Sequence, residues 1–139
     1  MVDRALVAAR MASARAHMVR VRKFLPAAAE ALERDADLQD LVAHNVWLAV
    51  QDCIDLAAHT VSDKGWGVAG SFAEGFELLH EHAVLAEGTS DAMIKAAGLR
   101  NRIVHRYGDL DWKIVHAAVA ELQQAVESFL RELAQFLGN

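Results

Sequence analysis

Apolar side chains recur in this sequence at helical spacings, most clearly after Asp111. From there to the C-terminal end, one apolar stripe advances in steps of three and four residues: Trp112, Val115, Val119, Leu122, Val126, Phe129, Leu133 and Phe136. This spacing is typical of an amphipathic helix in a packed antiparallel bundle. Asp111 is a suitable N-cap for that helix, because its carboxylate can accept hydrogen bonds from the first free amides.

Four further helical segments precede this last helix. The apolar pattern and its interruptions place them at residues 2–24, 37–59, 71–85 and 90–107. The first should end before Pro26, since proline disfavours helical geometry in the residue before it. Ser90 is the expected N-cap of the 90–107 helix, and Gly108 suits a left-handed residue after its end. The sequence therefore predicts an all-α fold, an antiparallel bundle of four long helices plus a short one.

Length and composition agree with this fold class. A chain of 139 residues is expected to form one domain, spanning residues 1–139, and needs no metal or disulfide to fold. Its single cysteine, Cys53, cannot form an internal disulfide and lies on an apolar helix face, where it is best interpreted as a small core residue. With no apolar leader segment and no long apolar run, we expect a cytoplasmic protein without a membrane span.

Charge is distributed unevenly along the chain. The net charge of −5 argues against a protein that coats nucleic acid non-specifically. Basic residues nevertheless dominate residues 1–25 and outnumber acids again in residues 98–113, whereas acids dominate residues 26–97. The sequence thus predicts two basic segments on an acidic body.

The 90–107 helix carries the most informative polar residues. Met93, Ile94, Ala97 and Val104 define its predicted buried stripe, and Asn101 falls inside that stripe. Buried polar groups need hydrogen-bond partners, because leaving one unpaired costs about 1–3 kcal/mol. Two interpretations remain open from the residues alone: contacts with neighbouring helices, or a cleft at a subunit boundary.

The same helix contains the pattern Arg-x4-His-x-Tyr within the string GLRNRIVHRYGDLDWKIV. This string resembles the signature segment of HepT-like proteins of the HEPN superfamily. The resemblance implies a homodimeric ribonuclease toxin, encoded with a minimal nucleotidyltransferase antitoxin that neutralises it, in some members by adenylylating the motif tyrosine. It assigns catalysis to Arg100 and His105, support to Asn101 and modification to Tyr107.

These residue types suit metal-independent RNA cleavage, in which the 2′-OH is the nucleophile. Histidine titrates near neutrality and can transfer protons, while arginine offers a fork of donors to a phosphate. We expect Asn101 to fix the ring of His105. On a regular helix Arg100 and His105 point about 140° apart. One chain alone therefore does not bring them together, which predicts a site shared by two protomers.

Further basic residues are candidates for RNA contacts. Arg102 and Arg106 lie within the motif segment, and Arg4, Arg15 and Arg22 share one side of the first helix. That side could guide RNA toward the cleft, although an arginine-rich helix face is also typical of a solvated surface.

Two alternatives compete with the ribonuclease interpretation. The first is a metal site, suggested by the acid/histidine pairs Glu77 with His80, Asp40 with His44 and Asp55 with His59. A di-iron bundle needs two Glu-x-x-His motifs and the chain has one, so we expect neither a metal nor another cofactor. The second is a non-catalytic helical partner or substrate-binding subunit of a nucleotidyltransferase.

Overall fold

The computed structural model describes residues 2–138, and its regular structure is entirely helical within that range. The elements are α1 (Arg4–Phe24), α2 (Ala29–Arg34), α3 (Ala36–Asp63), α4 (Phe72–Glu81), α5 (Glu87–His105), the 3₁₀ turn η1 (Tyr107–Asp109) and α6 (Trp112–Phe136). The all-α class and the four long helices are confirmed. There are two short α-helices, α2 and α4, where the sequence predicted one.

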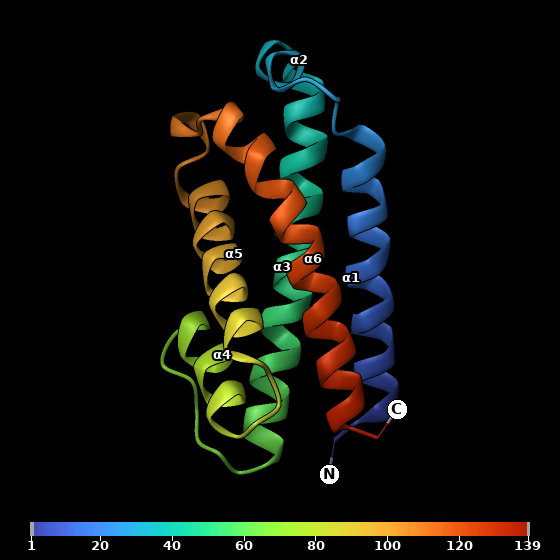
Figure 1. Ribbon diagram of the computed structural model, residues 1–139, viewed down its shortest axis with the longest axis vertical. Coiled ribbons are helices and arrows are strands. Elements are labelled where there is room, and N and C mark those ends of the chain that lie inside the picture. Colours follow the sequence, from blue (N-terminus) through green and yellow to red (C-terminus); the bar gives the residue numbers. More distant parts are fainter. Residues whose placement is uncertain (1, 139) are drawn as a thin grey trace.

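The four long helices lie side by side along the long axis of the molecule (Figure 1). The central helix, α3, contacts α1, α4, α5 and α6. The start of α1 and the end of α6 lie at the same end of the bundle (Figure 1). Helices α1 and α5 flank the bundle and make no contact with each other. Within one chain, the basic first helix is therefore separated from the motif helix.

The last helix follows its predicted pattern. The six central members of the stripe, Val115 to Leu133, are buried, whereas Trp112 is half-buried and Phe136 is exposed. The Asp111 carboxylate accepts hydrogen bonds from the amides of Lys113 and Ile114, as expected for an N-cap. Cys53 is fully buried in the core, as predicted, and burial raises the pKa of its thiol.

The predicted start of α5 at Ser90 is wrong. The helix begins at Glu87, and the buried Ser90 hydroxyl donates a hydrogen bond to the Phe76 carbonyl at 3.2 Å. Its end also differs, because the helix stops at His105 and Tyr107 opens a 3₁₀ turn. Gly108 belongs to that turn and does not have the expected left-handed conformation.

The predicted buried stripe of α5 is confirmed at Met93 and Ala97 but wrong at its other positions. The buried apolar residues of this helix are Met93, Ala96, Ala97, Leu99 and Ile103. Ile94 and Val104 are only half-buried and Asn101 is exposed. The helix is rotated so that Leu99 and Ile103 face the core. Because residues 96–98 are small, the apolar pattern of the sequence fits both the predicted and the observed rotation of the helix about its axis. Packing against α3, α4 and α6 selects the observed rotation.

Helix α2 was not predicted. It is six residues long, too short to show periodicity, and is anchored by the fully buried Leu32 next to α6. Within residues 2–138, no helix has the length and apolar character needed to cross a membrane.

Candidate active site

Three contacts hold Arg100 in place, one each to α3, to its own helix α5 and to α4. Its Nε donates a hydrogen bond to Gln51 Oε1 at 3.0 Å, and one terminal nitrogen donates to Asn101 Oδ1 at 3.0 Å. The guanidinium also lies over the ring of Phe72, 5.0 Å from its centroid. A side chain with this many partners loses little further freedom when it binds an anion, so the guanidinium of Arg100 is in a fixed position suited to anion binding.

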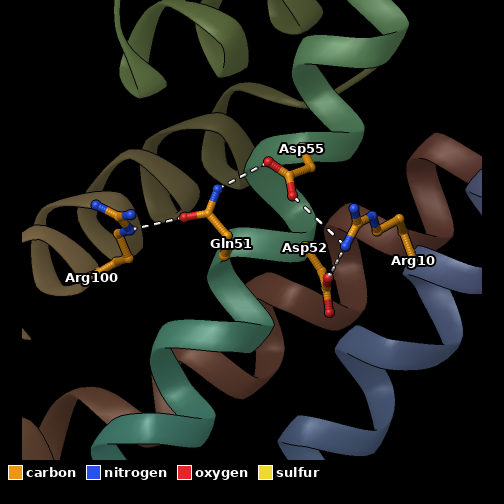
Figure 2. Close-up of polar contacts among 5 residues, drawn as sticks. All are labelled: Arg10, Gln51, Asp52, Asp55 and Arg100. Carbon is orange, nitrogen blue, oxygen red and sulfur yellow. Dashed lines mark hydrogen bonds and ion pairs between the residues drawn. The ribbon is translucent and has the colours of Figure 1, made fainter. Parts of the chain in front are cut away.

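Gln51 connects Arg100 to a network of charged side chains (Figure 2). Its Nε2 donates to Asp55 Oδ1 at 3.0 Å, and Asp55 Oδ2 lies 3.9 Å from the Arg10 guanidinium. Arg10 also pairs at 3.4 Å with Oδ1 of the buried Asp52. The contacts run from α5 across α3 to α1. The amide of Gln51 is thereby fixed with its oxygen toward Arg100, because its NH₂ group faces the Asp55 carboxylate.

His105 is the exposed last residue of α5 and differs from every other histidine of the chain. Each of the other six has a hydrogen bond or a ring contact: His17 with Asn45, His44 with Trp47, His59 with Asp3, His80 with Leu85, His82 with Trp66 and His116 with Pro26. No such contact involves His105 within residues 2–138. Both ring nitrogens are therefore free to exchange protons with a bound molecule.

Asn101 does not support His105 as expected. It is exposed, and its side-chain oxygen accepts the hydrogen bond from Arg100. The neighbouring amide thus helps to orient the arginine rather than the imidazole.

Tyr107 opens the 3₁₀ turn after α5 and bonds to α3, not to Arg100. Its hydroxyl donates to Asp40 Oδ1 at 2.5 Å, and its ring packs edge-on against Trp112 at 5.5 Å. Partial burial and the Asp40 carboxylate raise the pKa of Tyr107 above its usual range. Asp40 and Gln51 are eleven residues apart on α3, about 16 Å along the helix. Because α5 ends at His105, Tyr107 does not continue the helix face that carries Arg100.

The basic side chains predicted to contact RNA occupy different surroundings. Arg102 is exposed, makes no ion pair within residues 2–138, and lines a pocket of about 430 Å³ with Lys95 and Glu121. Arg106 pairs with Asp109 at 3.2 Å. Arg15 lies on α1, across the bundle, and pairs with Glu127 at 3.7 Å.

Arg4 and Arg22 also lie on α1, so three of the five candidates are remote from the motif of their own chain. Arg102 remains next to His105, since residues three apart share a helix face.

The acid/histidine pairs do not form a metal site. Within residues 2–138, no group of three or more His, Cys, Asp or Glu side chains is arranged to hold a metal ion. Asp40 instead accepts from Tyr107, Asp55 from Gln51, and His80 Nδ1 bonds to the Leu85 carbonyl at 2.9 Å.

Two residues of the site were not singled out by the sequence, Gln51 and Asp40. Gln51 and Asp55 stand one helical turn apart, a spacing typical of a side-chain pair, but nothing local shows that the pair faces Arg100. Asp40 was considered only with His44, whereas its partner is 67 residues away in sequence.

Known proteins resemble this chain in sequence. Residues 14–133 match the family described as ribonuclease HepT-like. The chain is 33% identical over 98 residues to an mRNA nuclease HepT of Shewanella oneidensis, covering 70% of this chain and 74% of that protein. It is 29% identical over 90 residues to a tRNA nuclease HepT of Aphanizomenon flos-aquae, covering 65% and 61% of the two proteins.

A solved structure shows the same fold. The structure of a tri-AMPylated Shewanella oneidensis HEPN toxin in complex with MNT antitoxin superimposes with a TM-score of 0.87 and 27% identity, over 97% of this chain and 99% of that one. Sequence match and shared fold extend over the motif helix and the helices around it. The chain therefore belongs to the HepT-like ribonuclease family.

Proposed function

We propose that this chain is a ribonuclease toxin in which Arg100 binds the scissile phosphate and His105 transfers a proton. One observation carries the proposal: α5 presents a preorganised arginine and, five residues on, the one histidine without a partner in the described part of the chain. The mRNA and tRNA nucleases among its relatives support RNA as the substrate.

The chemistry uses the RNA's own 2′-OH. As that oxygen bonds to phosphorus, the bond to the 5′-oxygen breaks, and a proton must leave the first oxygen and reach the second. His105 can take or supply that proton near neutral pH. The Arg100 guanidinium stabilises the charge that develops on the phosphate oxygens. Arg102 and, less directly, the paired Arg106 contribute positive charge beside the reacting group.

We further propose that two protomers share the site. Arg100 turns toward α3, whereas His105 points to solvent from another side of α5. A two-fold arrangement of α5 helices would set the arginine of one protomer against the histidine of the other. In that arrangement Arg4, Arg15 and Arg22 would lie on the flank of each protomer away from the shared site, because α1 and α5 are on opposite flanks of the bundle (Figure 1).

The partner we propose is a minimal nucleotidyltransferase antitoxin that adenylylates Tyr107. The superimposable HEPN toxin was found AMPylated and in complex with such an antitoxin. Tyr107 is the only tyrosine in this chain, so it is the sole phenol that can be modified. These events belong to the cytoplasm, where RNA and ATP are available.

A non-catalytic partner of a nucleotidyltransferase is the second candidate function. The exposed Tyr107 would serve it equally well. A free histidine beside an anchored arginine has no role in that alternative, which is why we favour the nuclease.

His105→Ala tests the choice. Losing proton transfer should slow RNA cleavage by about 10²–10⁴-fold and abolish growth arrest on expression without the antitoxin. The matched control is His82→Ala, an exposed histidine at the end of α4. Cleavage that persists in purified His105→Ala protein would contradict the role of His105 in the mechanism. Absence of cleavage by the purified wild-type protein would favour the non-catalytic role.

A further inference from the structure

Tyr107 and Asp40 form an isolated pair on the surface of the bundle. The phenol donates to Asp40 Oδ1 at 2.5 Å, and the side chain of Tyr107 keeps 37% of its surface exposed. The edge-on contact with Trp112 holds the ring, and the 3₁₀ turn holds the backbone. The hydroxyl therefore has a fixed position and a fixed proton acceptor while it stays accessible.

A phenol is a poor nucleophile while it keeps its proton. Partial burial and the neighbouring carboxylate raise the pKa of Tyr107, so the phenolate is scarcely present at neutral pH. The proton must then leave during the attack itself, and a base in hydrogen-bond contact with the hydroxyl is the group that can receive it.

We propose that Asp40 is this base: when the antitoxin transfers AMP to Tyr107, Asp40 of the toxin accepts the phenolic proton. The inference rests on the proposed modification of Tyr107. The Tyr107 oxygen bonds to the α-phosphorus of ATP, the bond from that phosphorus to the bridging oxygen breaks, and pyrophosphate leaves. The proton moves to Asp40 Oδ1 and from there to water. The substrate thus supplies a catalytic residue for its own modification.

The surroundings of the pair leave room for the nucleotide. Tyr107 and Asp40 line an open pocket of about 270 Å³ together with His44, Trp47 and Val104. Trp47 offers an apolar surface, and His44 is the one basic side chain among these lining residues. Within residues 2–138 no hydrogen bond, ion pair or ring contact joins Asp40 or Tyr107 to Arg100 or His105, so the modification and RNA cleavage use separate groups.

Asp40→Asn tests whether Asp40 accepts the phenolic proton or only holds the Tyr107 hydroxyl in place by a hydrogen bond. Asparagine keeps an oxygen that accepts the hydrogen bond but is not a base at neutral pH. We expect the initial rate of AMP incorporation from α-labelled ATP, with the cognate antitoxin, to fall about 100-fold or more. Asp40→Glu keeps a carboxylate and should be labelled at least about 10-fold faster than Asp40→Asn. Thermal melting and antitoxin binding confirm that each variant is folded and recognised.

Asp37→Asn is the matched control, because it removes the same charge one turn earlier on the exposed face of α3. It should be labelled at the wild-type rate. Equal labelling of Asp40→Asn and wild type, equal rates for the Asn and Glu variants, or an equal loss in Asp37→Asn would each overturn the role of Asp40. Absence of labelling in the wild type, or labelling of Tyr107→Phe, would instead refute the proposed modification.

Discussion

The two motif residues on α5, Arg100 and His105, differ in how the surrounding structure holds them. Arg100 is half-buried and held by Gln51, Asn101 and Phe72, whereas His105 is exposed and its side chain makes no hydrogen bond, ion pair or ring contact within residues 2–138. An arginine gains from being fixed, because its charge is permanent and its donors must point at the substrate. A histidine that exchanges protons must be reached by the substrate. The fold therefore anchors Arg100 and leaves His105 accessible.

The largest expected effect comes from mixing two inactive variants. Arg100→Ala and His105→Ala homodimers each lack one group in every site. If each site combines groups from two protomers, half of the dimers in an equimolar mixture are heterodimers. Each heterodimer has one intact site and one site that lacks both groups. About a quarter of the wild-type activity should therefore return. RNA cleavage after co-refolding measures it. Each variant alone provides the baseline, and a mixture that stays inactive would place both groups in one protomer.

A smaller effect is expected from Gln51→Leu, which removes the acceptor of the Arg100 Nε hydrogen bond. Hydrogen bonds to charged groups contribute about 1.5–3 kcal/mol, equivalent to roughly 10–150-fold in cleavage rate if the contact survives in the transition state. Steady-state kinetics should show the loss mainly in kcat, because the guanidinium keeps its charge but not its direction.

The exposed Gln124→Leu on α6 serves as the control for Gln51→Leu. Gln51→Glu keeps an acceptor and should recover part of the rate. Wild-type kinetics in Gln51→Leu would show that Phe72 and Asn101 orient Arg100 without Gln51.

The smallest expected effect concerns Arg10 and Asp52, at the α1 end of the network that starts at Arg100. Arg10→Met leaves Asp52, which is only 5% exposed, without its cation. Because Arg10 itself is about half-exposed, we expect a loss of about 1 kcal/mol in the free energy of unfolding. Urea denaturation measures this loss, and cleavage should change less than in Gln51→Leu.

Adding Asp52→Asn to Arg10→Met should restore the free energy of unfolding, since it removes the buried charge. A double variant no more stable than Arg10→Met would show that the carboxylate is solvated.

Much of the architecture was predictable from local pattern. The stripe of α6 and its Asp111 cap were identified because large apolar side chains there allow one helix rotation only. Helix α5 was predicted wrongly at both of its ends and over part of its buried face. Its alanines and glycines fit several rotations, and Ser90, an expected cap, is satisfied inside the helix by the carbonyl of Phe76.

The amino-acid sequence shows which groups are available: Arg100, His105 and the single tyrosine within eight residues, at the end of one helix of an all-α bundle. Their hydrogen-bond partners depend on how the helices pack. Gln51 and Asp40 are 49 and 67 residues from the side chains they bind, and no helical periodicity encodes such distances. The packing of α5 on α3 sets which side of the motif is anchored, and it leaves His105 for a substrate or a second protomer.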